Sequence, residues 1–168
     1  MAGVITPVSL VKADEYKFVI FDAPNDANLP MYLQELIREN VAHVVRVCDP
    51  TYETSSLKEA GIQVHDWPFA DGDPPPDTII KNWLGLIKQT FVEDKKKNPG
   101  ANKTIGIHCV AGLGRAPVLV AIALIEKGMD PLDAVQIIRG RRRGAINAKQ
   151  LSFLESYKRK SKKDCVIQ

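Results

Sequence analysis

Residues 104–125 of this chain read TIGIHCVAGLGRAPVLVAIALI, and this stretch decides the fold. Its first five residues predict a buried strand, and residues 115–127 predict a buried helix with Pro117 in the first turn. Residues 109–115 therefore form a loop that joins the end of a strand to the N-terminus of a helix. Strand and helix patterns also alternate along the rest of the chain, so we expect an α/β fold whose central strand leads into this loop.

The loop carries Cys109 and Arg115 with five residues between them, a spacing that suits the binding of a tetrahedral dianion. A cysteine at a helix N-terminus beside a cation is readily ionised to a nucleophilic thiolate. Gly112 and Gly114 allow the backbone to approach an oxyanion closely. The expected phosphate-binding residues are Val110, Ala111, Gly112, Leu113, Gly114 and Arg115. The alternative, a buried structural cysteine, explains neither the glycines nor the arginine, so we predict phosphate-monoester hydrolysis through a phosphocysteine.

The reaction also needs a proton donor for the leaving oxygen, and the segment Trp67-Pro68-Phe69-Ala70-Asp71-Gly72 offers one. Asp71 is our candidate acid, Asp73 is its rival, and Asp66 is expected to lie in the preceding strand. The alternative for Asp71 is a solvated turn carboxylate. We expect His108 to bond the loop and tune the thiolate rather than to act as a base.

The segment HCVAGLGRAPVLVAIALIE at 108–126 resembles the signature of the phosphatases of regenerating liver, the prenylated branch of the protein tyrosine phosphatase superfamily. The segments VVRVCDPTYET at 44–54, DWPFADG at 66–72 and RRRGAINAKQL at 141–151 support the resemblance. It implies the cysteine-phosphatase fold, with a central, mostly parallel sheet flanked by helices. It further implies a dual-specificity-type domain over residues 1–157 that acts on a phosphorylated protein or a phosphoinositide.

The resemblance gives expectations for single residues. Asp71 matches the general acid of the family, although most relatives carry a second acid where this chain has Ala70. Ala116 stands where the superfamily usually has Ser or Thr, so we expect slow hydrolysis of the phosphocysteine. The family cysteine that matches Cys48 forms a reversible disulfide with the catalytic one, whereas the residues alone favour a core cysteine.

The resemblance also implies partners. A slow enzyme with a good anion site suggests an alternative function as a pseudo-enzyme-like module. Such a module would bind cystathionine-β-synthase-type domains of magnesium transport mediators. Self-association into homo-oligomers on membranes is implied as well. Arsenate reductases and rhodanese-like enzymes also use a cysteine loop, but Asp71 and the arginine spacing argue against them. Thiolate and guanidinium supply what a metal would, so we expect no metal and no cofactor.

The chain closes on Cys165-Val166-Ile167-Gln168, which fits a farnesylation box, and residues 158–168 are expected to form a polybasic tail. Lys or Arg occupies positions 158–160, 162 and 163. One prenyl chain binds membranes only marginally, and adjacent basic residues supply the second signal. We therefore expect a peripheral protein on the cytoplasmic face of the plasma membrane or endosomes, and a cytoplasmic or nuclear one without the lipid. The alternative for the tail is a disordered basic segment that acts as a nuclear address.

With 168 residues, 45% of them hydrophobic, the chain is long enough for one domain with a sizeable core. The net charge of +3 arises from the C-terminal end, and no aromatic residues or motifs typical of nucleic-acid binding accompany it. Three cysteines do not indicate a disulfide framework, and we expect neither a signal peptide nor a membrane span. Predicted strands are 8–11, 17–21, 41–47, 62–66 and 104–108, and predicted helices are 29–39, 77–93, 115–127, 131–139 and 147–158.

Two details remain open in the sequence, and two further expectations concern the segment 94–103 and the helix at 29–39. Arg139, Arg141, Arg142 and Arg143 form either a solvated helix end or a rim that attracts anions. Asn147 and Gln150 either face the loop or, in the case of Asn147, cap the last helix. The segment 94–103 is expected to be a solvated connection. The helix at 29–39 is expected to turn Leu33, Leu36 and Ile37 toward the core.

Overall fold

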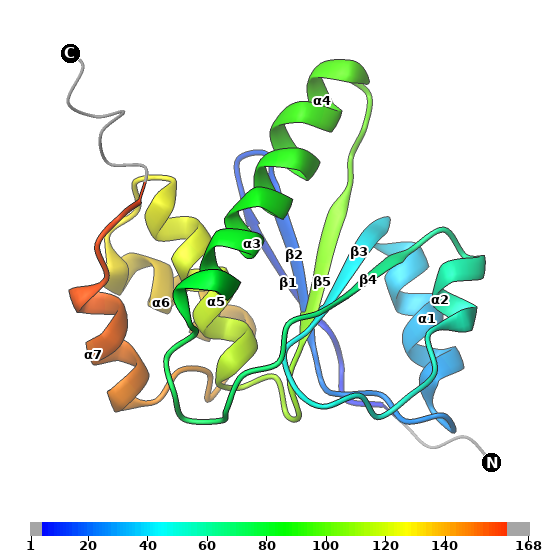
Figure 1. Cartoon of the computed structure of the whole chain (residues 1–168), viewed down its shortest axis with the longest axis horizontal. Helices are drawn as coiled ribbons and strands as arrows, with labels where there is room; N and C mark the ends of the chain where they lie inside the picture. The colour runs from blue at the N-terminus through cyan, green and yellow to red at the C-terminus, as the bar shows by residue number, and fades with distance from the viewer. Residues whose placement is uncertain (1–4, 161–168) are drawn as a thin grey trace.

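The computed structural model describes residues 5–160 and shows a five-stranded sheet with helices on both faces (Figure 1). The strands lie in the order β1-β2-β5-β3-β4. β1 and β2 are antiparallel, and the remaining neighbours are parallel. The prediction of an α/β fold with a mostly parallel sheet is confirmed, and the strand that leads into the cysteine loop is the central one. The strands are β1 (Ser9–Ala13), β2 (Tyr16–Phe21), β3 (Val41–Arg46), β4 (Gln63–Asp66) and β5 (Thr104–His108).

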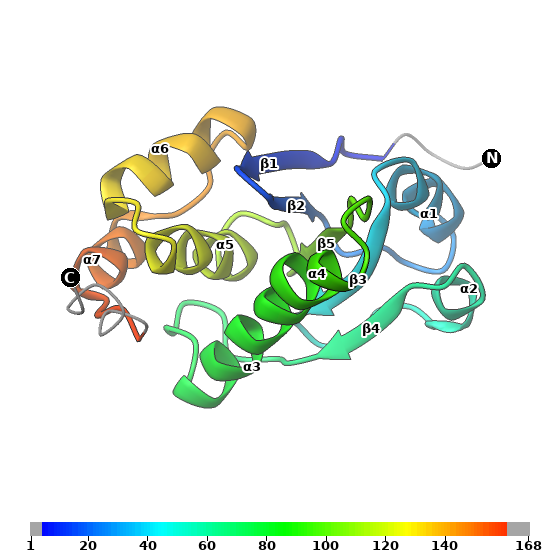
Figure 2. The same cartoon turned by 90° about the horizontal axis from the view of Figure 1, so that it is seen from above.

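The helices form two unequal layers, one on each face of the sheet (Figures 1 and 2). They are α1 (Leu29–Arg38), α2 (Ser55–Glu59), α3 (Asp77–Lys88), the π-helix η1 (Gln89–Glu93), α4 (Asp94–Lys97), α5 (Arg115–Glu126), α6 (Pro131–Arg141) and α7 (Ala148–Ser156). α1 and α2 cover the smaller core, and α3, η1, α5, α6 and α7 contribute to the larger one. Between residues 5 and 160, no helix has the length and apolar character needed to cross a bilayer.

Helix α5 is the centre of the larger core and fixes the end of the cysteine loop. Every residue from Ala116 to Ile125 is buried, so this helix is apolar all round, as an internal helix must be. The indole Nε1 of Trp83 in α3 donates to the carbonyl of Leu119, 2.7 Å away, which joins α3 to α5. The N-terminus of α5 is thereby held directly beneath the loop.

The structure corrects several predicted boundaries. The segment 94–103 is not wholly a connection, because the helical chain continues through η1 into α4 and ends at Lys97. The short helix α2 was not predicted, since only Leu57 in it is buried and its pattern is too short to show a period. In α1 the buried face is Leu29, Tyr32 and Leu36, whereas Ile37 is 57% exposed, so the prediction for Ile37 was wrong.

Candidate active site

In the loop from Cys109 to Gly114, the backbone carbonyls are hydrogen-bonded whereas, in the part of the chain that the structure describes, the backbone N–H groups of residues 110–114 are not. Every carbonyl in it accepts a hydrogen bond from a group outside the loop. The donors are His108 Nδ1, the N–H of Ala23, the Arg142 guanidinium, the N–H of Ile146 and the N–H of Val118. By contrast, no N–H of residues 110–114 donates to another residue within the described range 5–160. These N–H groups, together with the N-terminus of α5, leave a set of donors for an anion.

Glycine is required at position 112 by conformation and by contacts, and a side-chain end closely approaches Gly114. Gly112 has φ of +67°, and a Cβ there would lie 2.6 Å from Nη2 of Arg142 and 2.8 Å from the carbonyl oxygen of Phe21. A Cβ on Gly114 would lie 2.9 Å from Nε2 of Gln150. A larger residue at position 112 would push the loop away from the groups that shape it, whereas at position 114 the end of the Gln150 side chain would have to shift.

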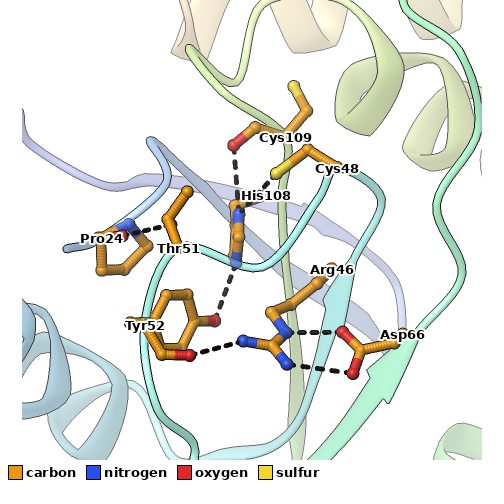
Figure 3. Close-up of polar contacts among 8 residues, drawn as sticks. All are labelled: Pro24, Arg46, Cys48, Thr51, Tyr52, Asp66, His108 and Cys109. Atoms are coloured by element: carbon orange, nitrogen blue, oxygen red, sulfur yellow. Dashed lines mark hydrogen bonds and ion pairs between the residues drawn. The ribbon is translucent and has the colours of Figure 1, made fainter. Parts of the chain in front are cut away.

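His108 supports Cys109 from behind the loop, and its protonation state follows from its neighbours (Figure 3). Its Nδ1 lies 3.1 Å from the carbonyl oxygen of Cys109, which can only accept, so Nδ1 carries the proton. Its Nε2 therefore accepts from the hydroxyl of Tyr52, 2.8 Å away. Burial lowers the pKa of His108 to about 4 and raises the pKa of Tyr52, so both groups are neutral at pH 7.

Tyr52 is itself held by an ion pair at the end of the sheet (Figure 3). Arg46 donates from Nη1 to the Tyr52 carbonyl at 2.9 Å and lies over the Tyr52 ring. Its Nε and Nη2 bind the two carboxylate oxygens of Asp66 at 2.6 and 3.0 Å. Asp66 is the last residue of β4, so this carboxylate is committed to Arg46 and not to the loop.

Cys48 follows β3 and lies near the same histidine. Its Sγ is 3.9 Å from Nδ1 of His108, and both Cys48 and Cys109 are buried and unbridged. Burial and the neighbouring Cys109 raise the pKa of Cys48, so this second sulfur remains a thiol at neutral pH.

Arg115 and Asp71 face each other across the opening of the loop. Nη1 of Arg115 donates to the carbonyls of Phe69 at 2.9 Å and Val47 at 3.3 Å, which ties the segment carrying Asp71 to the loop. Nε of Arg115 is buried and has no hydrogen-bond partner among residues 5–160. Oδ1 of Asp71 lies 3.8 Å from that Nε, and the Asp71 side chain is 80% exposed against 11% for Arg115.

These groups line one pocket of about 340 Å³. Cys109, Arg115 and Asp71 border it together with the predicted loop residues, except Gly112, and with Gly144, Asn147 and Gln150. Asn147 caps α7 and exchanges hydrogen bonds with Gln150 in a capping box, so the two open alternatives for this residue are both realised. Within residues 5–160, no group of three or more His, Cys, Asp or Glu side chains is arranged to hold a metal ion.

The four arginines at the end of α6 and directly after it divide between the surface and the interior. Arg142 is buried and donates from Nε to the carbonyl of Gly112 at 2.7 Å and from Nη2 to that of Ala111 at 3.0 Å. The same guanidinium pairs with Asp22, which follows β2. Arg139 is exposed, although its guanidinium donates to the carbonyls of residues 145 and 146. Arg141 and Arg143 are exposed as well, so Arg142 is the one buried member of the cluster.

The sequence pattern described as Protein-tyrosine phosphatase matches residues 26–157, which is most of the chain. This chain belongs to the protein-tyrosine phosphatase family. It is 58% identical over 161 residues to the Probable protein tyrosine phosphatase type IVA A of Dictyostelium discoideum, covering 96% of this chain and 93% of that protein. It is 49% identical over 146 residues to human protein tyrosine phosphatase type IVA 3, covering 87% and 81%.

A solved structure of a protein tyrosine phosphatase from Leishmania major superposes with a TM-score of 0.82 at 44% identity, over 92% of this chain and 100% of that one. The relatives place this phosphatase in the type IVA branch, so the expected family is confirmed, as is a cysteine-based protein tyrosine phosphatase activity. Arsenate reductase and rhodanese are thereby set aside.

Sequence reasoning missed three residues that shape the site of this phosphatase. Tyr52 and Arg142 lie in segments that support the family resemblance, but nothing local in those segments gives either residue a role, and Asp22 lies in no such segment. Arg142 stood among four basic residues that looked alike, followed by Gly144, whose φ of +87° lets the chain turn back toward the loop.

Proposed function

We propose that Cys109 is the nucleophile of this phosphatase. Its thiolate attacks phosphorus, an S–P bond forms, and the bond from phosphorus to the leaving oxygen breaks. Asp71 gives its proton to that oxygen, and in the second step it takes a proton from the water that splits the S–P bond. Arg115 and the N–H groups of residues 110–115 stabilise the charge on the remaining phosphate oxygens.

The observation that supports this proposal most is the set of hydrogen-bond donors in the loop that lack acceptors in the described part of the chain. All of the loop's carbonyls are occupied from outside, while the N–H groups of 110–114 and Nε of Arg115 have no acceptor among residues 5–160. A buried donor such as Nε of Arg115 is costly without an acceptor, and a phosphate group would satisfy it together with the loop N–H groups. The pocket of about 340 Å³ holds these donors beside the sulfur and the exposed Asp71.

The test of the nucleophile uses an aryl phosphate and the Cys109→Ser variant. We expect no turnover but retained binding of the phosphate ester, together with a trapped phosphate on Cys109 of the unmodified enzyme, located by mass spectrometry. Substantial turnover in the variant would exclude Cys109 as the attacking group.

The test of the acid compares Asp71→Asn with Asp73→Asn, a matched exposed carboxylate two residues away. We expect the first to lower kcat/KM for a phosphate ester with a poor leaving group by roughly 10²- to 10⁴-fold. The second should leave kcat/KM close to that of the unmodified enzyme. The reverse result would transfer the role to Asp73.

A second candidate function is partner binding at the same pocket, and the shape of its rim favours it. Val110 and Leu113 are 62% and 40% exposed, so the opening presents apolar side chains. Ala116 offers no hydroxyl to assist release of the cysteine, which supports slow breakdown of the phosphocysteine. We propose that a slow catalyst of this kind also holds a protein partner, with the cystathionine-β-synthase-type domain of a magnesium transport mediator as the first to test.

Rapid-mixing kinetics separate the two functions. We expect a burst of one leaving group per enzyme followed by slow turnover, and we expect Ala116→Ser to speed the slow phase. Partner binding should survive in Cys109→Ser and fall in Val110→Asp. Rapid steady turnover without a burst would exclude the slow step, and unchanged binding in Val110→Asp would place any partner elsewhere.

We also propose that oxidation by peroxide joins Cys109 to Cys48. Peroxide converts the Cys109 thiolate to a sulfenic acid, and the Cys48 thiol displaces water to form the disulfide. Their shared neighbour His108 and the electrostatic effect of Cys109 on Cys48 support this proximity. Peptide mapping after mild peroxide treatment should find the Cys48–Cys109 disulfide. In the Cys48→Ser variant, Cys109 should instead be oxidised further, to the sulfinic or sulfonic acid. Equal recovery of activity by a thiol in both proteins would contradict the proposal.

Finally, we propose that a farnesyl group on Cys165 and the basic tail tether the phosphatase to the cytoplasmic face of membranes. This proposal rests on the sequence, because Cys165 lies outside the described residues. Self-association would follow from the raised local concentration there. A Cys165→Ser variant should leave the membrane fraction of cells while keeping its activity, and unchanged membrane association would contradict farnesyl tethering.

A further inference from the structure

A second hollow lies at the end of the sheet opposite the Cys109 pocket. Its volume is about 220 Å³, and it is bordered by the β1–β2 turn, by η1, by α4 and by the segment that enters β5. β5 runs from this end at Thr104 to the cysteine loop at His108, so the two pockets are separated by the length of the central strand. Figure 1 shows the β1–β2 turn beside the α3–α4 helix at this end and the β5–α5 loop at the other.

Lysine side chains without a carboxylate partner border this hollow. Lys12 and Lys17 stand directly opposite each other on the antiparallel strands β1 and β2. Like charges in that position repel each other. Among residues 5–160, neither forms an ion pair, and Lys95 donates only to the carbonyl of Ala101 at 2.7 Å. Three lysine side chains thus border one small space without an ion-pair partner among residues 5–160.

Two carboxylates also border the hollow, and both of them are paired with another lysine. Asp14 and Glu15 pair with Lys127, whose Nζ lies 3.8 and 2.9 Å from them. Lys103, the fourth lysine on the wall, pairs with Asp94 at 2.9 Å. The excess positive charge therefore belongs to Lys12, Lys17 and Lys95.

A buried hydroxyl on the same wall also lacks a partner. Thr90 is 2% exposed, and its Oγ1 forms no hydrogen bond to any residue between 5 and 160. It lies in η1, a π-helix, and π-helical turns inside longer helices are frequent at functional sites. An unsatisfied buried hydroxyl costs stability unless a ligand or water bonds it.

We infer that this hollow is a binding site for a small phosphate-bearing polyanion, separate from the Cys109 pocket. The three unpaired ammonium groups supply the charge, and lysine ammoniums bind phosphate as point charges. The hydroxyl of Thr90 donates to a phosphate oxygen once the lysine side chains move aside to admit the anion. Binding removes the repulsion between Lys12 and Lys17 and satisfies the hydroxyl.

The test follows backbone amide resonances while inorganic pyrophosphate is added to the phosphatase. Because the Cys109 loop also binds phosphates, the readout is taken residue by residue. We expect saturable shifts in residues 12–17, 90–95 and 101–103 with a dissociation constant different from that of residues 109–115. The Lys12→Ala, Lys17→Ala double variant should weaken binding at this site at least tenfold, and shifts at 109–115 should be unchanged.

Two further variants make the result decisive. Lys81→Ala, Lys88→Ala removes the same charge from the exposed surface of α3 and should bind pyrophosphate as the unmodified protein does. Thr90→Val should weaken binding by roughly fivefold, the worth of one hydrogen bond. It should not lower the melting temperature of the ligand-free protein, because no bond is lost.

The proposal fails if saturable shifts occur only at residues 109–115, or if the two double variants bind pyrophosphate alike. The source of the phosphate is decided with vesicles of phosphatidylcholine containing phosphatidic acid. A loss of vesicle binding confined to the Lys12, Lys17 variant assigns the site to a lipid headgroup, whereas equal vesicle binding assigns it to a soluble anion.

Discussion

At the scale of single residues, the tautomer of His108 is set by a carbonyl that cannot donate. Nδ1 must carry the proton because it faces the Cys109 oxygen, and Nε2 is then left as an acceptor for Tyr52. The histidine is thus neutral, and its two hydrogen bonds connect Tyr52 to the Cys109 backbone. Its role as a base is excluded by its two occupied nitrogens.

Removing the Tyr52 hydroxyl tests this assignment. Tyr52→Phe leaves Nε2 of a buried imidazole without a donor, and we expect a loss of about 1–2 kcal/mol in the free energy of unfolding. We also expect the nitrogen-15 spectrum of His108 to keep the Nδ1–H tautomer, which the Cys109 carbonyl fixes, while the Nε2 resonance shifts because that nitrogen loses its hydrogen-bond donor. Tyr16→Phe is the control, since the structure gives the Tyr16 hydroxyl no hydrogen bond within residues 5–160. Equal stability of the two variants would contradict a stabilising hydrogen bond from Tyr52 to His108.

Residues defined by local spacing could be predicted, and residues defined by distant contacts could not. Cys109 and Arg115 are recognisable because the loop, the glycines and the helix follow each other in sequence. Tyr52 reaches His108 across 56 positions and Arg142 reaches Asp22 across 120, and no local pattern encodes such pairs. The charged composition of residues 139–143 is typical of a surface segment. Arg142 is nevertheless buried, because its acceptors come from other elements of the fold.

At the scale of elements, the cysteine loop is held by a residue from the connection between α6 and α7. Arg142 binds two loop carbonyls, the hydroxyl of Ser9 in β1 and the carboxylate of Asp22. One planar guanidinium therefore joins β1, the residue that follows β2, and its own α6–α7 connection to the loop. Lysine could supply the charge but not this fork of donors.

The prediction is that Arg142→Lys weakens both the fold and the site. We expect about 2–3 kcal/mol lower stability, because buried acceptors lose their donors, and at least a tenfold lower kcat/KM, because the loop loses its outer support. Arg143→Lys is the matched control, since Arg143 is exposed. Denaturant unfolding and initial rates measure the two effects. Equal kcat/KM in the two variants would show that the loop keeps its shape without Arg142.

The elements themselves followed from periodicity where a face is buried. All five strands and the long helices lie within a few residues of their predicted positions. Apart from β4, each of them has an apolar face that is buried. α2 lacks such a face. In α1, Ile37 fits the helical period yet is exposed. The face that packs against the sheet is formed by Leu29, Tyr32 and Leu36 instead. Composition fixes which face is apolar, but packing against the sheet decides how far it extends.

At the scale of the whole molecule, neutral buried histidines make the stability depend on pH. His43 in β3 is 3% exposed, and its Nδ1 lies 3.1 Å from Nε2 of His65 in β4. Burial, followed by the positive charges of His65 and Lys103, lowers the pKa of His43 to about 4, against a smaller opposing effect of Asp94. His108 behaves in the same way for the same main reason, and burial lowers the pKa of His65 too.

The sign of the effect follows from where the protons bind. Between pH 6.5 and about 4, the unfolded chain takes up protons on these histidines and the folded one does not. Their contribution to stability is therefore complete above pH 6.5 and is lost as the pH falls toward 4. One group shifted this far is worth up to ~3 kcal/mol, a large share of the stability of an ordinary domain.

Replacing His43 by a residue that keeps a polar atom at the Nδ1 position but does not titrate isolates its share. We expect His43→Asn to reduce the slope of unfolding free energy against pH by up to ~1 kcal/mol per pH unit between pH 6.5 and 4. Gln63→Asn, an exposed change on β4, should keep the original slope. Denaturant unfolding across that range gives both values. Asp66 does not confuse the window, because its bonds to Arg46 lower its pKa and confine its effect to more acidic solutions. An unchanged slope in His43→Asn would mean that His43 takes up its proton in the folded protein as readily as in the unfolded one.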